Sequence, residues 1–151
     1  MTSAFDPQIL LQATTEVASE RRAPLPVDEY TATVGEITVR SWSSRDGSKS
    51  GLALDVPVIV EVPAELQADH GLPPTLTVKD SIMLDLTETG GIDYGKGKNG
   101  RLRMYREALD MNKAGEPFAP GMMQGRYLKV RVKHEEYEGN IQERVAGLAQ
   151  L

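Results

Sequence analysis

Residues 51–62 read Gly-Leu-Ala-Leu-Asp-Val-Pro-Val-Ile-Val-Glu-Val, and every even-numbered position in this stretch is Leu or Val. Successive side chains of a strand point to opposite faces, so this period of two predicts a long β-strand with one apolar face. Pro57 falls on the other face and has no N–H to donate, so it requires a sheet edge or a bulge. The stretch indicates a protein built on a sheet with a buried face.

Upstream of this strand, the same alternation runs from Glu29 to about residue 42. Gly35 interrupts it and permits a bulge, after which the apolar positions resume. Residues 43–50 are rich in turn formers, and Asp46-Gly47 forms the predicted tip of a hairpin. The first strand is therefore expected to pair with residues 51–62.

Downstream, apolar alternation predicts a third strand over residues 78–86, with an interruption expected near Asp80. The preceding segment, which contains two adjacent prolines, is expected to be a polar loop. Asn99 is a candidate N-cap for a helix that ends near Met111, because Leu102, Tyr105 and Leu109 recur at helical spacing.

Two more strands are predicted over residues 126–134 and 141–148, joined by a turn at residues 138–140. The element order is three strands, a helix and two strands, which is the order of the OB fold. We therefore expect a mostly β domain over residues 25–151: a five-stranded OB-like barrel with a helix between strands three and four. Another small barrel or a sandwich fits the same order.

Residues 1–24 form a predicted helical arm and linker. Asp6 is a candidate N-cap, Pro7 suits the first helical position, and apolar residues recur along the segment to residue 22: Ile9, Leu10, Ala13 and Val17. The prolines at 24 and 26 prevent the helix from continuing. The arm is expected to pack on the barrel or on another subunit of a homo-oligomer.

The composition is that of one globular domain: 151 residues, 40% hydrophobic and 26% charged. The chain has no cysteine, no secretory signal layout and no apolar run near the ~20 residues that span a bilayer. These features favour a cytoplasmic protein that does not associate with membranes.

Motifs for catalysis are missing from the sequence: there is no phosphate-binding glycine loop, no His-x-x-x-His and no nucleophile elbow. His70 lies in a predicted loop and His134 at a strand end, and both are expected to be surface or core histidines. The sequence therefore predicts a protein that is not an enzyme and needs no metal or cofactor.

Charge is distributed unevenly along the chain. Residues 1–93 carry 6 Lys or Arg against 15 Asp or Glu, whereas residues 94–151 carry 11 against 7. The segment 94–106 contains five cations and no acid, and glycines flank two of them: Lys96, Lys98, Arg101, Arg103 and Arg106. Such a segment suits phosphate binding, although a solvated loop and an ordinary helix face fit it as well.

Apolar and basic side chains alternate along the predicted fourth strand, so its two faces differ in character. Its outward positions carry one aromatic residue and three cations: Tyr127, Lys129, Arg131 and Lys133. Trp42, between Arg40 and Arg45, is a further candidate. Backbone cations without a base-reading motif favour single-stranded nucleic acid bound with little sequence preference. The predicted contacts are Arg40, Trp42, Arg45, Lys49, Tyr94, Lys96, Lys98, Arg101, Arg103, Tyr127, Lys129, Arg131 and Lys133.

Short motifs resemble the OB-fold single-stranded DNA-binding proteins of bacteriophages. They are residues 25–30 (LPVDEY), 48–52 (SKSGL), 101–102 with 106–109 (RL and REAL), and 125–126 (GR) before the alternating valines. The resemblance implies coating of single-stranded DNA in phage replication or recombination. The alternative prediction is a phage virion component, such as a capsid-decorating protein that docks by its arm.

Overall fold

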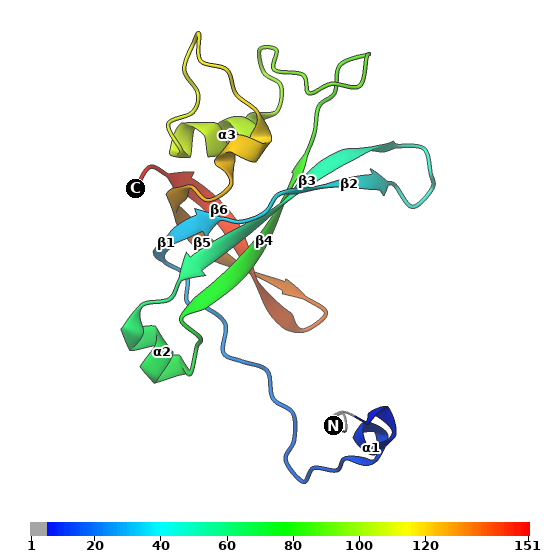
Figure 1. Cartoon of the computed structure of the whole chain (residues 1–151), viewed down its shortest axis with the longest axis vertical. Coiled ribbons are helices and arrows are strands. Elements are labelled where there is room, and N and C mark those ends of the chain that lie inside the picture. The colour runs from blue at the N-terminus through cyan, green and yellow to red at the C-terminus, as the bar shows by residue number, and fades with distance from the viewer. Residues whose placement is uncertain (1–5) are drawn as a thin grey trace, which may run out of the picture.

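The computed structural model describes residues 6–151, and these residues form mostly β-structure (Figure 1). In chain order the elements are α1 (Pro7–Gln12), β1 (Glu29–Val34), β2 (Thr38–Ser43), β3 (Ser50–Glu61), α2 (Ala64–His70), β4 (Thr75–Met83), α3 (Gly100–Ala108), the short 3-10 helix η1 (Pro120–Met123), β5 (Tyr127–Tyr137) and β6 (Asn140–Ala149). The six strands belong to one antiparallel sheet. The predicted β class is confirmed.

The sheet runs in the order β2-β3-β1-β5-β6, with β4 on the other side of β3. β1 and β2 pair in succession with the same strand: Val34 lies opposite Val58, and Thr38 lies opposite Asp55. They are the two halves of the predicted first strand, which is why the sheet has six strands where the sequence predicts five.

Gly35 and Pro57 explain the break between these halves. The Pro57 carbonyl accepts a hydrogen bond from the Gly35 N–H at 2.8 Å, so the edge of Pro57 that lacks an N–H faces the interruption. A Cβ on Gly35 would lie 2.9 Å from the Pro57 ring, so no larger residue fits there without movement. The predicted interruption at Gly35 is confirmed, and it lies opposite Pro57, for which the sequence requires an edge or a bulge.

The sheet does not close into the predicted barrel. β4 and β6 are neighbours, yet within residues 6–151 no backbone ladder joins them. The seam between them is bridged by side chains of α3, which lies at one end of the sheet (Figure 1). The Arg101 guanidinium donates to the Asp80 carboxylate on β4 at 2.8 Å and to the Val145 carbonyl on β6 at 3.3 Å.

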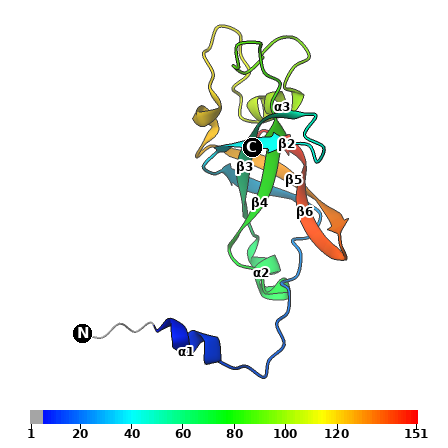
Figure 2. The same ribbon diagram turned by 90° about the vertical axis from the view of Figure 1, so that its right-hand side faces the viewer.

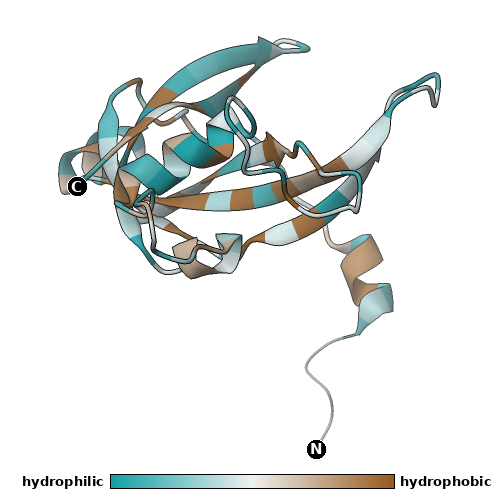
Figure 3. Cartoon of the chain, turned by 90° about the horizontal axis from the view of Figure 1, so that it is seen from above, coloured by the Kyte–Doolittle hydropathy of each residue, from teal (hydrophilic) through white to brown (hydrophobic). Residues whose placement is uncertain are grey.

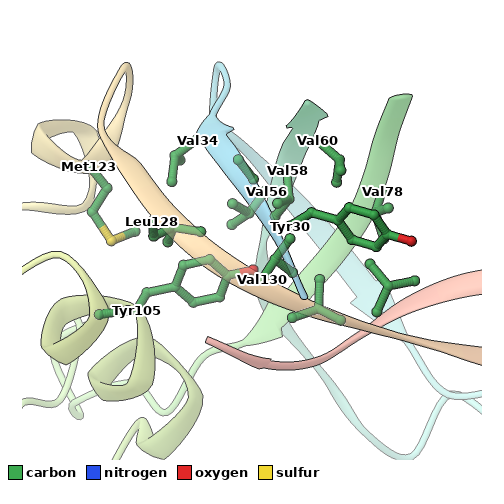
Figure 4. Packing of buried hydrophobic residues seen from close by; sticks show 14 of the residues in the cluster. Tyr30, Val34, Val56, Val58, Val60, Val78, Tyr105, Met123, Leu128 and Val130 are labelled. Carbon is green, nitrogen blue, oxygen red and sulfur yellow. The ribbon is translucent and has the colours of Figure 1, made fainter. Parts of the chain in front are cut away.

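Inward-facing side chains of the strands and of α3 form one core (Figure 4). β3 and β5 supply alternate valines and leucines, as their period of two predicts, and α3 adds Leu102, Tyr105 and Ala108. The hydroxyl of fully buried Tyr105 donates to Asp80 at 2.6 Å, so the helix is fixed to the same carboxylate that holds Arg101.

Three predictions about local structure are wrong. The predicted loop after β3 contains α2, which lies at the end of the sheet away from α3 (Figure 1). β4 continues through Asp80 because the whole strand pairs with β3. Asn99 stands at the N-cap position of α3 but makes no capping bond, because its side chain bonds to the backbone of Asp85 and Asp93.

The arm is helical over a shorter stretch than predicted. Asp6 caps α1 by accepting from the Gln8 N–H at 3.0 Å, as predicted, but the helix ends at Gln12 rather than near residue 22. It lies away from the sheet (Figure 2), and its apolar residues Ile9 and Leu10 are exposed. None of the helices in residues 6–151 combines the length and apolarity that crossing a bilayer requires.

Candidate nucleic-acid interface

The outer face of β5 is the most regular of the predicted binding surfaces. Leu128, Val130 and Val132 are fully buried, which turns the alternate positions of the strand to solvent. These exposed positions are Tyr127, Lys129, Arg131 and Lys133. The predicted orientation of all four is confirmed.

Cations outnumber acids on this face, which we call the β5 face. Arg144 of β6 lies opposite Lys133, and Glu29 of β1 lies opposite Arg131 at 3.9 Å from its Nε. Within residues 6–151, Lys129 and Lys133 make no ion pair, so their charges remain available to a bound anion. Tyr127 is 56% exposed beside them and offers a ring for stacking.

The far end of this hairpin has the opposite charge. β5 and β6 extend past the body and turn at Glu138 and Gly139, which both have positive φ angles, 51° and 79°, as a two-residue hairpin turn requires. Glu135 and Glu136 precede the turn, and the outer part of the hairpin is hydrophilic (Figure 3). A polyanion on the β5 face is therefore confined to the part of the strand near Lys129 and Lys133.

The predicted contacts on β2 serve partly structural roles. The Arg40 Nε donates to the Asp55 carboxylate at 3.0 Å, and its Nη2 donates to the Ser81 hydroxyl at 3.3 Å, so Arg40 ties three strands together. Hydrogen bonds from Arg40 and Ser81 lower the pKa of Asp55. The Trp42 indole covers Gly51, and its buried N–H has no partner among residues 6–151.

Arg45 and Lys49 lie in the exposed turn between β2 and β3, which extends well beyond the sheet (Figure 1). Asp46 organises this turn by accepting from the Ser44 and Ser48 hydroxyls, both at 2.7 Å, and from the Ser48 N–H at 3.0 Å. These bonds, of which that from Ser44 has the largest effect, lower the pKa of Asp46 to about 2.

A buried asparagine fixes the basic loop before α3. Asn99 is 5% exposed; it accepts from the Asp85 N–H at 2.8 Å and donates to the Asp85 and Asp93 carbonyls at 2.9 and 2.8 Å. Its own N–H donates to the Asp85 carboxylate at 2.8 Å. Residues 85–99 are thereby held closed at their base, and Lys96 and Lys98 are presented from a fixed loop rather than from a free one.

This loop and one side of α3 enclose a hollow of about 200 Å³, which we call the basic hollow. Its charged lining side chains are all cations: Lys96, Lys98, Arg103 and Arg106. Tyr94, Asn99 and Asn112 complete the polar lining. Arg103 and Arg106 are one helical turn apart, which brings both to the side that faces the loop.

Arg106 is a functional candidate that the predicted contacts do not include. Its Nε donates to the Met111 carbonyl at 3.2 Å, and its guanidinium lies 4.2 Å from the centre of the Phe118 ring and 5.5 Å from that of Tyr94. The sequence places Arg106 in the basic segment, and its three-residue spacing from Arg103 is the one sequence feature that predicts both side chains on the same side of the helix. Phe118 comes from a loop after the helix, and no local pattern connects it to Arg106.

The structure therefore divides the predicted contacts among four places. Arg101 faces the β4–β6 seam, Arg103 and the loop lysines line the basic hollow, and β1 and β3 separate the β5 face from β2. The end of β6 connects two of these places. Ala149 pairs with Lys129, and the next residue, Gln150, donates to the Glu107 carbonyl of α3 at 3.0 Å.

A metal site requires several acidic or histidine side chains close together. Residues 6–151 contain no group of three or more Asp, Glu or His side chains arranged to hold a metal ion. The His134 ring bonds to the Leu25 carbonyl at 2.7 Å, where it joins the linker to β5. No family model and no curated protein matches this chain.

Proposed function

We propose that this protein is a non-catalytic single-stranded DNA-binding protein of the phage type, which coats DNA during replication or recombination. The observation that carries the proposal is the β5 face, where two unpaired lysines, an arginine and a tyrosine alternate outward along one strand. Phosphates attract such a row regardless of base sequence, and an exposed ring stacks on any base.

The layout of the sheet supports an OB-like fold. β1 and β2 act as one bent strand that pairs with both β3 and β5, and α3 lies in the chain between β4 and β5. β4 and β6, each paired on one side only among residues 6–151, face each other across the seam that Arg101 bridges. The OB fold is itself a five-stranded, partly open barrel, so a seam without backbone pairing is compatible with it.

Charge contributes more to the proposed binding than stacking does. The chain has only eight aromatic residues, five Tyr, two Phe and one Trp, and Tyr105 is buried in the core. Stacking is worth about 1–3 kcal/mol per base, so Tyr127 adds a limited amount. We therefore expect an affinity that falls steeply as salt rises.

The test is a fluorescence-anisotropy titration of labelled oligo-dT at several salt concentrations, with duplex DNA as a control. Lys129→Gln and Lys133→Gln are each expected to weaken binding and to reduce the slope of log K against log salt by about 1. Lys79→Gln removes the same charge on β4, near Asp55, and is expected to leave both unchanged. Wild-type protein that does not bind oligo-dT at low salt would rule out the proposal.

A second candidate function is that of a structural virion component or homo-oligomer subunit. The observation that favours it is α1, whose apolar residues Ile9, Leu10 and Leu11 are all more than half exposed on an arm away from the sheet (Figures 2 and 3). Stable oligomers that lack affinity for oligo-dT, and that dissociate on Ile9→Asp, would favour this function.

A further inference from the structure

We infer that the basic hollow is a phosphate-binding site that takes a phosphomonoester, either at the end of a DNA strand or on a free nucleotide. If the phosphate lies at the end of a DNA strand, the inference rests on the proposed function; if it belongs to a free nucleotide, the inference is independent of that function. The inference assigns a terminal phosphate to Arg106, Lys96 and Lys98, whereas the proposed ligand of the β5 face is the phosphate backbone of the DNA.

The charge around the hollow favours an anion. Four cations line it, and within residues 6–151 the only acid that pairs with any of them is Glu107, 3.8 Å from the Arg103 Nε. Within residues 6–151, Arg106, Lys96 and Lys98 have no ion-pair partner. Lys96, Lys98 and Arg103 are exposed and Arg106 is half-buried, so all four like charges converge on a hollow that is open to an anion from solvent.

Arg106 is already held in a binding geometry. Its Nε is occupied by the Met111 carbonyl, and the ring of Phe118 lies against its plane, so the side chain loses little freedom when a ligand arrives. The two terminal nitrogens of the guanidinium remain free to donate. A planar pair of donors matches two oxygens of one phosphate.

The size and charge of the hollow favour a terminal phosphate. At about 200 Å³ the hollow is smaller than the ~300–1,000 Å³ of pockets that enclose a whole drug-sized ligand, so it suits a phosphate group with its base outside. A backbone phosphodiester carries a single negative charge, whereas a phosphomonoester carries about 1.5–2 at pH 7. Four cations around one hollow suit the more highly charged group.

Contacts at the base of the loop and with Phe118 position the loop beside the hollow. Asn99 closes the base of residues 85–99, and Tyr94 packs edge-on against Phe118 with ring centres 6.3 Å apart. The backbone that carries Lys96 and Lys98 is therefore positioned beside Arg106 before any ligand binds. Preorganisation of this kind lowers the entropy that binding must overcome.

The probes that test the inference are thymidine 5′-monophosphate and thymidine, titrated into the full chain by calorimetry. The monophosphate is expected to bind and thymidine is not. Arg106→Gln, and separately Lys96→Gln with Lys98→Gln, are each expected to weaken monophosphate binding about tenfold or more, because each removes charge-assisted hydrogen bonds. The lysine variant leaves the packing of Arg106 intact, so it remains informative if Arg106→Gln fails to fold.

The control separates this site from the β5 face. Lys129→Gln with Lys133→Gln is expected to weaken oligo-dT binding while leaving monophosphate binding within about twofold. Oligo-dT with a 5′-phosphate that binds more tightly than the hydroxyl-ended strand assigns the site to strand ends, whereas equal binding assigns it to free nucleotides. Monophosphate binding that is absent, or that neither hollow variant weakens, would overturn the inference even if oligo-dT binds.

Discussion

Asp80 is the residue whose removal is expected to damage the fold most through a polar contact. Its side chain is only 10% exposed, and it accepts hydrogen bonds from the Tyr105 hydroxyl at 2.6 Å and from the Arg101 Nη2 at 2.8 Å. Both donors belong to α3, and Asp80 belongs to β4. One carboxylate thus fixes the helix over the seam where β4 and β6 are not paired.

The expected cost of Asp80→Ala has two parts. The buried Tyr105 hydroxyl loses its acceptor, which costs about 1–3 kcal/mol. Arg101 loses its counter-ion, but its side chain is 39% exposed, so this loss lies nearer to the ~1 kcal/mol of a surface pair than to the ~3–5 kcal/mol of a buried one. The free energy of unfolding is therefore expected to fall by about 2–4 kcal/mol.

Urea denaturation of four variants, two single mutants with their double mutant and one control, measures this effect. Asp69→Ala is the matched control, because Asp69 is an exposed carboxylate on α2 with no partner in residues 6–151, and it is expected to cost less than about 0.5 kcal/mol. In a double-mutant cycle, Asp80→Ala and Tyr105→Phe are expected to show a coupling energy of about 1–2 kcal/mol. A coupling energy near zero, or a cost for Asp80→Ala no larger than the control, would refute the role of the carboxylate in joining α3 to β4.

Two further predictions concern single contacts. Gly51→Ala places a Cβ 3.0 Å from the indole Nε1 of Trp42, which is the only tryptophan in the sequence. We therefore expect the fluorescence emission of Trp42 to shift to longer wavelength. Gly147→Ala is the control, because a Cβ there meets nothing within 4 Å, and it should leave the emission spectrum unchanged. Burial raises the pKa of Glu143, but the hydrogen bonds that its carboxylate accepts from Arg22 and from the Leu25 N–H outweigh burial, so the pKa is lowered overall. This contact therefore stabilises the linker above about pH 4.5, and the stabilisation is lost as the pH falls through the lowered pKa of Glu143. Proteolysis of the arm should therefore accelerate at acid pH in the wild type and already be fast near neutral pH in Glu143→Gln; equal rates near neutral pH would contradict this.

The strands could be predicted from the sequence because one rule decides them. In residues 52–62 and 128–132, where apolar residues alternate, the structure has a strand with that face buried. In β2 the predicted inward orientation of Val39 is wrong, because this side chain is 65% exposed. The same rule predicts the outward position of Lys129 and Lys133. These features depend only on neighbours in the chain and on the pleat of a strand.

Features that depend on distant partners could not be predicted in this way. Asn99 has the right residue type and position for an N-cap, but Asp85, fourteen residues earlier, takes its side chain. α2 has only seven residues and begins after Pro63, without a side-chain cap, so no periodicity reveals it. The guanidinium of Arg106 is held by Phe118, which lies in a loop beyond the helix.

The basic segment before and within α3 shows how one run of charges serves two purposes. In the sequence, Arg101 and Arg106 are equivalent members of the run, but the helix turns Arg101 towards Asp80 and Arg106 towards the basic hollow. A substitution at Arg101 loosens α3 at the seam, and the same helix carries two of the four cations of the hollow. Lost affinity in an Arg101 variant therefore does not show that Arg101 contacts a ligand. The contact can be assigned only from Arg106, Lys96 and Lys98, whose charges are not engaged in the seam.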